Sequence, residues 1–141
     1  MAQTTMKKKQ LSKWNFAIGT TSRVPNSGGL HYLIADFDNL KYPWAIFTYM
    51  PFNLVQNMVL QKTPHGWHLY TDAVMTFDLL QKYLLAMDAD PAWVEIGKER
   101  GYYFLADKKE IDFPWPVEHM VLHYGKKRKE RNTTRLRSPI P

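Results

Sequence analysis

The stretch "LHYLIADFD", residues 30–38, decides the fold expected for this chain. Its continuous apolar run predicts a strand that is buried on both faces. The run ends in two carboxylates at alternate positions, Asp36 and Asp38. Because alternate residues of a strand point to the same face, these two acids project together while Phe37 turns to the opposite layer. We therefore expect a core strand with a pair of acids at its end.

A second stretch, "KTPHGWHLYT" at residues 62–71, predicts a tight turn inside a β-hairpin over 58–71. Gly66 allows a backbone to approach a ligand closely, and His68 enters the following strand. His65 and His68 are three apart, whereas two imidazoles on one strand face need a spacing of two. The alternative for His68 is a structural strand histidine.

The remaining pattern predicts more strands and one clear helix. The helix spans 76–88, is capped by Thr76, and has an apolar stripe along one side. The stripe consists of Phe77, Leu80, Leu84 and Met87. The other expected strands are 13–21 at a sheet edge, 44–50, 93–97, 101–107 and 119–125, with one helical turn at 52–57. This order predicts an α+β fold, an RNA-recognition-motif-like antiparallel or mixed sheet with a helix on one face.

The charge distribution divides the chain into three parts. We expect a disordered N-terminus over 1–12, one domain over 13–125 and a flexible basic tail over 126–141. The tail holds seven basic residues and one Glu, which accounts for the whole net charge of +6. Such a tail attracts polyanions, so it is expected to bind nucleic acid; the alternative is a solubilising terminus or the start of a further region. The expected contacts are Lys126, Lys127, Arg128, Lys129, Arg131 and Arg135.

Composition excludes several classes of site and of protein. The chain has no cysteine, so it has no disulfide, cysteine nucleophile, thiolate zinc site or iron–sulfur cluster. No apolar run approaches the roughly 18 residues that a membrane span needs, and the polar N-terminus is not a secretory signal. A cytoplasmic protein without a membrane partner is expected.

The acid pair of Asp36 and Asp38 suits a divalent cation. Two neighbouring carboxylates repel each other, and a cation between them reverses that repulsion. Their hard oxygen atoms favour Mg²⁺ or Mn²⁺, and two such ions about 3.5–4 Å apart can clamp the oxygens of a phosphoryl transfer. The alternative is that both acids are turn formers beside Asn39.

Taken in order, these motifs resemble those of the archaeo-eukaryotic primase superfamily, which includes primase-polymerases. There, a strand ending in D-x-D precedes a turn of the form S/T-G/P-x-G-x-H, and "TPHGWH" at 63–68 is similar, with Thr and Pro in place of the commoner Ser and Gly. The third motif of the family is a carboxylate that is often followed by an arginine-bearing strand. Residues 86–105 are similar, with Asp90 as the best match and Arg100 at the basic position. Asp88 and Asp112 are the alternatives for the third acid.

The resemblance covers about residues 30–107 and implies a minimal catalytic core of this family. Its implied activity is that of a DNA primase/polymerase, a nucleotidyltransferase that adds NTP or dNTP on a single-stranded DNA template with two metal ions. It implies Mg²⁺ or Mn²⁺ on Asp36, Asp38 and Asp90. It implies nucleotide contacts from His68, Lys62, Thr63, Gly66 and Arg100. A helicase or a helical accessory primase domain or subunit is an implied partner, in a prokaryotic, plasmid or viral replication context.

Two other functions fit the same sequence. A non-catalytic nucleic-acid-binding module would use the basic tail and stacking aromatics. The stacking candidates are Trp44, Trp67, Trp93 and Trp115, each of which has core packing as its alternative. A rolling-circle nickase would use a tyrosine such as Tyr83 with a His-x-His pair, and the histidine spacing disfavours it.

The basic tail predicts a salt-dependent contribution to DNA binding. Deleting 126–141 is expected to weaken binding of single-stranded DNA mainly at low salt, because the tail neutralises phosphates and releases counterions. Fluorescence anisotropy across a salt series measures this effect. If the affinity and its dependence on salt concentration were unchanged, the tail would make no contribution to DNA binding.

Overall fold

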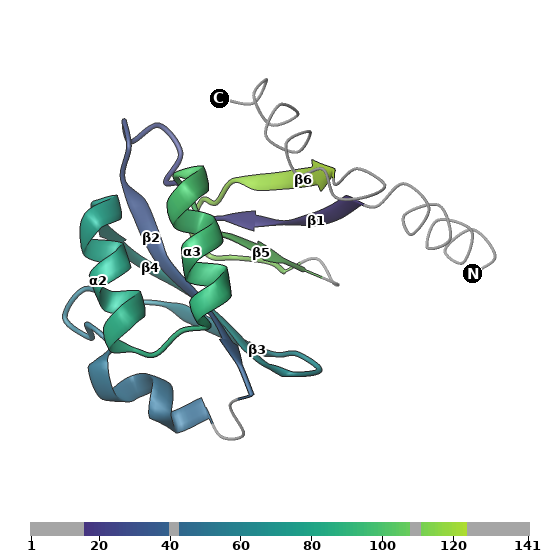
Figure 1. Ribbon diagram of the computed structural model, residues 1–141. Coiled ribbons are helices and arrows are strands. Elements are labelled where there is room, and N and C mark those ends of the chain that lie inside the picture. Colours follow the sequence, from purple (N-terminus) through teal and green to yellow (C-terminus); the bar gives the residue numbers. More distant parts are fainter. Residues whose placement is uncertain (1–15, 40–42, 108–110, 124–141) are drawn as a thin grey trace. The chain divides into compact units, whose positions relative to one another are not determined.

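The computed structural model describes residues 16–39, 43–107 and 111–123 (Figure 1). Its strands form two three-stranded antiparallel sheets, ordered β5-β1-β6 and β2-β4-β3, where a single sheet was expected. The elements are β1 (Phe16–Thr21), β2 (His31–Asp38), the 3₁₀ helix η1 (Pro43–Tyr49), β3 (Met58–Lys62), β4 (Gly66–Met75), α2 (Phe77–Ala86), α3 (Pro91–Arg100), β5 (Phe104–Ala106) and β6 (His119–His123). The α+β class is thereby confirmed. The predicted terminal segments 1–12 and 126–141 lie outside the described residues.

The chain divides into two compact units. In the first, β1 pairs with β6, with Gly19 opposite Met120, and the Thr20 hydroxyl donates to Asp107 Oδ2 at 2.8 Å. The second unit spans 21–105 and 111–118 and contains the β2-β4-β3 sheet with η1, α2 and α3. In Figure 1, α2 and α3 lie in front of β2 and β4, so both helices cover one face of this sheet. The predicted acids and the predicted hairpin all belong to this second unit.

Strand β2 is buried on both faces, as its apolar run predicted. Leu33 and Ala35 are fully buried, and so are their neighbours Tyr32 and Ile34, which point to the other face. Phe37 is also buried, whereas Asp36 is half-buried and Asp38 is exposed. The two acids therefore lie at the end of β2, where the strand leaves the core and becomes exposed.

The predicted hairpin is confirmed by β3 and β4. Its turn holds Gly66 directly opposite Asp38, at the last residue of β2. A Cβ at Gly66 would collide with the carbonyl of Phe37 and would lie 3.0 Å from the Cα atom of Asp38. Only glycine therefore allows the hairpin to lie against the end of β2.

The predicted helix over 76–88 is confirmed as α2. The Thr76 hydroxyl oxygen accepts a hydrogen bond from the Leu79 amide at 3.2 Å, which is the expected N-cap. The predicted apolar stripe faces the core, where Leu80 and Leu84 are fully buried. Packing of this stripe on the sheet fixes the C-terminal end of α2, from which the chain runs to Asp90.

The predicted strand at 93–97 is wrong, because these residues lie within helix α3. Asp90 caps the helix by accepting a hydrogen bond from the Trp93 amide at 3.1 Å, and Pro91 occupies the first turn. Gly101 ends it with a left-handed φ of 94°. These cap residues outweigh the strand propensity of the Trp, Val and Ile residues between them.

Two further strand predictions need correction. Residues 44–49 of the predicted strand 44–50 lie in the 3₁₀ helix η1, which begins at Pro43 and is followed by Met50 and Pro51. Proline presets φ at one end and removes a backbone donor at the other, which favours a short helical segment over a strand. The strand within 13–21 exists as β1, but it is the central strand of its sheet and not an edge strand.

None of the helices within the described ranges is long and apolar enough to span a lipid bilayer.

The contact at Gly66 predicts a large effect of a single methyl group. Gly66→Ala should destabilise the fold by about 3 kcal/mol, because the main chain of β2 must move. Gly28→Ala is the matched control, since nothing lies within 4 Å of its Cβ position and only the left-handed φ of +74° opposes it. That variant should lose about 1 kcal/mol. Urea unfolding measures both, and equal losses would contradict the close approach at Gly66.

Candidate metal centre

Three carboxylates converge at the end of β2. Asp36, Asp38 and Asp90 each offer an oxygen atom, and these three atoms all lie within 4.8 Å of one another. Oxygen atoms that share one Mg²⁺ lie about 3–4 Å apart, given metal–oxygen distances of about 2.1 Å. Small side-chain rotations would therefore bring this acidic cluster, defined by the three aspartates, to coordination geometry.

A backbone hydrogen bond brings the third acid to the first two. The Asp90 amide donates to the Asp36 carbonyl oxygen at 2.8 Å, which joins the start of α3 to the end of β2. The Asp90 carboxylate uses Oδ2 to cap α3. Its position is therefore fixed from two sides, by the strand and by the helix.

Ionisation of the Asp38 carboxyl group is disfavoured where it lies. Its pKa is raised above the usual value of 3.8 by partial burial, then by the charges of Asp36 and Asp90, while His65 and His68 oppose the rise. The charged form of Asp38 is thus destabilised beside the other two acids. A bound divalent cation would reverse this preference, which is the behaviour expected of a cation site.

His68 lies beside Asp36 on the neighbouring strand. The two residues are direct register partners, and His68 Nε2 lies 3.4 Å from Asp36 Oδ1. Both side chains are largely buried, with 14% and 17% of their surface exposed. His68 therefore contacts Asp36, one of the three candidate metal ligands, directly. The contact with nucleotide phosphates that the sequence predicts for His68 would have to be made by this same imidazole ring. Its Nδ1 atom is buried and makes no hydrogen bond within the described part of the chain.

The polar groups of the hairpin turn are used largely by the turn itself. The Gly66 amide donates to the Thr63 hydroxyl at 2.9 Å, and the Thr63 amide donates to the Gly66 carbonyl at 2.9 Å. Lys62 Nζ donates to the Thr63 carbonyl at 3.2 Å and lies 5.5 Å from the centre of the Trp67 ring. The His65 carbonyl accepts from the Asn39 amide at 2.6 Å, which fixes the turn beside the acids. The Lys62 side chain is exposed.

The structure does not bring Arg100 to the acidic cluster. Arg100 ends α3, whereas Asp90 caps its start, and a helix of 10 residues is about 15 Å long. Its guanidinium lies 5.7 Å from the centre of the Tyr102 ring. The alternative acids Asp88 and Asp112 are both exposed and fall outside the group of three. The predicted nucleic-acid contacts Lys126, Lys127, Arg128, Lys129, Arg131 and Arg135 lie outside the described residues.

The four tryptophans proposed for base stacking differ in exposure. Trp44 on η1 is 64% exposed and is accessible to a base. Trp115 belongs to the core, and Trp93 Nε1 donates to the Phe104 carbonyl at 2.8 Å. Trp67 packs against Lys62. Core packing is therefore the better description of Trp93 and Trp115.

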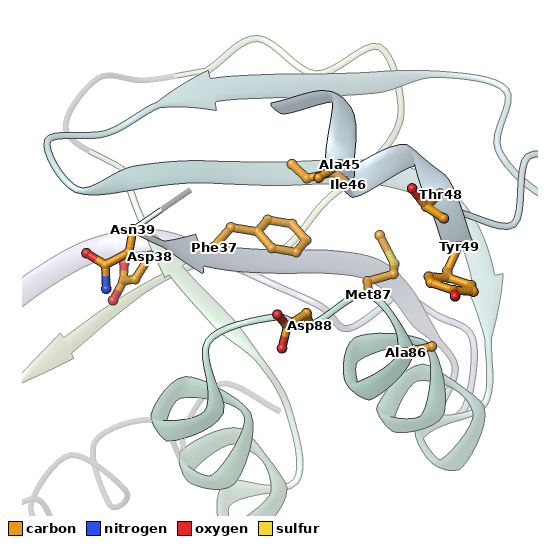
Figure 2. Close-up of a pocket in the computed structure, with 10 residues that line it drawn as sticks. All are labelled: Phe37, Asp38, Asn39, Ala45, Ile46, Thr48, Tyr49, Ala86, Met87 and Asp88. Carbon is orange, nitrogen blue, oxygen red and sulfur yellow. The ribbon is translucent and has the colours of Figure 1, made fainter. Parts of the chain in front are cut away.

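A cavity of about 420 Å³ beside the cluster was not predicted from the sequence. Asp38 and Asp88 line it together with residues of η1 and the end of α2, including Tyr49 and Met87 (Figure 2). Segment 44–50 was interpreted as a strand, so no sequence pattern placed Tyr49 near an acid. The cavity has a volume typical of small-ligand sites.

The arrangement combines three hard oxygen ligands, two nearby imidazoles and an adjoining cavity. Carboxylates without thiolates select Mg²⁺, Mn²⁺ or Ca²⁺ over zinc. A cation held beside a cavity that Asp38 also lines can bind the phosphates of a ligand in that cavity. Divalent ions bound by carboxylates in this way can assist reactions at phosphate groups.

Searches of protein-family models, curated proteins and solved structures found no match to this chain. The function must therefore be inferred from its own residues.

The raised pKa of Asp38 predicts a stability effect with a definite sign. An acid whose folded-state pKa is raised destabilises the fold when ionised, above that folded-state pKa, and ceases to do so as pH falls below 3.8. In EDTA at pH 7, Asp38→Asn should therefore raise Tm slightly, on the order of 1–2 °C after discounting for solvent screening. The gain should shrink as pH falls toward 4, as wild-type Asp38 becomes protonated.

Excess Mn²⁺ provides the internal control for this measurement. The ion should stabilise the wild type more than the Asp38→Asn variant, because the variant lacks one ligand. Differential scanning calorimetry with EDTA and with Mn²⁺ measures both differences. A variant that is less stable than the wild type in EDTA at pH 7 would show that Asp38 is not under repulsion.

Proposed function

We propose that this chain is a metal-dependent nucleotidyltransferase of the DNA primase/polymerase type. The observation that carries the proposal is the convergence of Asp36, Asp38 and Asp90 from β2 and from the start of α3. Two of these acids share a strand, and the third arrives through a hydrogen bond to that strand. The group is built by the fold and not by chance proximity of flexible side chains.

The family resemblance and the RNA-recognition-motif-like core are part of the same proposal. In support, the D-x-D pair ends a buried strand, and the "TPHGWH" turn lies opposite that pair in the sheet. The third acid occurs where the order of motifs requires it. The β2-β4-β3 sheet with both α-helices on one face suits such a core. Arg100 is the last residue of helix α3, whereas the basic residue of the family motif lies on a strand. This position departs from the family pattern.

In the proposed reaction, the three carboxylates would hold divalent ions and His68 would orient Asp36. Bound Mg²⁺ or Mn²⁺ would supply Lewis-acid activation of the attacking 3′-hydroxyl and would offset the charge that develops on the α-phosphate. The 3′-hydroxyl gives its proton to solvent water and its oxygen forms a bond to the α-phosphorus, while the bond from that phosphorus to the bridging oxygen breaks and pyrophosphate leaves. Lys62 and His65 at the exposed hairpin turn provide hydrogen-bond donors for the β- and γ-phosphates. The single-stranded DNA template and the NTP or dNTP are the substrates.

A second candidate is a non-catalytic module that binds single-stranded nucleic acid. The observation that favours it is a group of exposed aromatic side chains on and after η1. Trp44, Tyr49 and Phe52 are 64%, 61% and 54% exposed. Aromatic rings of this kind stack with bases at about 1–3 kcal/mol each. This candidate gives the acidic cluster no role, so loss of the cluster distinguishes the two functions.

Substitution of the acids tests the proposed catalysis. Asp36→Asn and Asp38→Ala should each lower Mn²⁺-dependent nucleotide incorporation by at least about 100-fold, because each removes a ligand of the ions. Extension of a labelled primer on single-stranded DNA measures this rate. The fold should be retained, since each change relieves repulsion.

Asp112→Ala is the matched control, because Asp112 is exposed and lies outside the cluster. It should keep wild-type activity. Wild-type rates in both cluster variants would refute the assignment, as would undiminished activity in EDTA.

A further inference from the structure

The cavity beside the acidic cluster shares a residue with it. Asp38 belongs to the cluster and also lines the cavity of about 420 Å³. A ligand whose phosphates reach ions on the cluster can therefore place its remaining part in the cavity. The volume lies in the range of small-ligand sites, and it is adequate for a sugar and a base.

The two ends of the cavity differ in chemistry. Asp38 and Asn39 mark one end, and Met87 and Tyr49 mark the other, where Thr48 also lies (Figure 2). Buried Phe37 lies between them. An aromatic ring and a thioether are suitable partners for the flat face of a base. This difference matches a nucleoside whose phosphates lie at the acid end.

Asp88 lies between the two ends of this cavity. In Figure 2 its carboxyl group is drawn between Asp38 and Met87. Asp88 is two residues from Asp90, so their Cα atoms are at most about 7 Å apart. A sugar is joined to its α-phosphate by one ester link, which places the sugar next to the metal centre. We therefore expect the sugar hydroxyls of such a ligand to lie near Asp88.

The backbone at Asp88 is unusual for a residue with a side chain. Its φ is +64°, and the Ala89 amide donates to the Leu84 carbonyl at 3.0 Å, a pattern that closes helix α2. Glycine is the usual residue at this left-handed position after a helix. Aspartate is one of the few residues with a side chain that adopt this conformation readily, and glycine adopts it at no steric cost.

The charge of Asp88 selects what can lie against it. Asp88 is not one of the three clustered acids, so an ion on that cluster need not neutralise it. A carboxylate only accepts hydrogen bonds and repels phosphate oxygens. Its suitable partner is a neutral group with O–H donors, and the hydroxyls of a ribose are such a group.

We propose that this cavity binds the nucleoside of an incoming ribonucleotide, and that the Asp88 carboxylate accepts hydrogen bonds from the sugar hydroxyls. The inference rests on the proposed function and deepens it, because it selects NTP over dNTP as the preferred substrate. Asp88 is then a specificity-determining residue. It contacts the sugar and takes no part in holding the ions.

Binding measurements without primer or template separate the cavity from the metal centre. Calorimetric titration in excess Mn²⁺ would compare tripolyphosphate, ATP, 2′-deoxy-ATP and 2′,3′-dideoxy-ATP on the full chain. Wild-type protein should bind ATP at least about 10-fold more tightly than the dideoxy form, because a hydrogen bond to a charged acceptor is lost. The 2′-deoxy form should bind with an affinity between these two.

Asp88→Gly is the informative variant, because glycine suits the left-handed backbone. Its Tm should equal or exceed that of the wild type, so a loss of binding cannot be attributed to unfolding. ATP should bind it no more tightly than dideoxy-ATP, while its affinity for tripolyphosphate should be no lower than that of the wild type. Asp112→Ala is the control and should keep the preference for ATP.

Two results would overturn the inference in distinguishable ways. If tripolyphosphate binds with Mn²⁺ but the sugar hydroxyls do not affect affinity in wild type or in Asp88→Gly, the sugar site is wrong and the metal centre stands. Persistence of the ATP preference in Asp88→Gly would equally remove Asp88 from this role. If tripolyphosphate does not bind even with Mn²⁺, the proposed function and the sugar site both fail.

Discussion

The candidate site depends on one backbone hydrogen bond between two distant parts of the chain. The Asp90 amide donates to the Asp36 carbonyl at 2.8 Å and thereby holds the start of α3 at the end of β2. The bond joins the third carboxylate to a pair of like charges, and the core packing of Ala89 and Val94 on either side of Asp90 supports it. Burial of β2 and the N-cap of α3 stabilise the two ends of this link. The fold thus raises the pKa of Asp38, first by partial burial and then by the like charges that it assembles around this residue.

Much of β2 and of the hairpin could be predicted because their patterns are local. A continuous apolar run with alternating acids at its end indicates both the strand and the shared face of Asp36 and Asp38. The turn residues before Gly66 indicate the hairpin, and Thr76 indicates the start of α2. In each case, residues close in sequence determine the local structure.

The remaining features depend on competing preferences or on distant contacts. Trp93, Val94 and Ile96 favour a strand, but the caps at Asp90 and Gly101 produce a helix. The order of motifs pointed to Asp90, whereas its approach to Asp36 follows from the packing of α3. The cavity could not be predicted, because it forms between η1 and the end of α2, which are far apart in the sequence.

The most direct test of the acidic cluster as a cation site is a crystal soaked with Mn²⁺ and a nucleoside triphosphate, with diffraction data collected at the manganese edge. We expect an anomalous peak within about 2.1–2.3 Å of oxygen atoms from Asp36, Asp38 and Asp90, with triphosphate oxygens completing the coordination. A peak elsewhere, or no peak beside these three side chains, would contradict it.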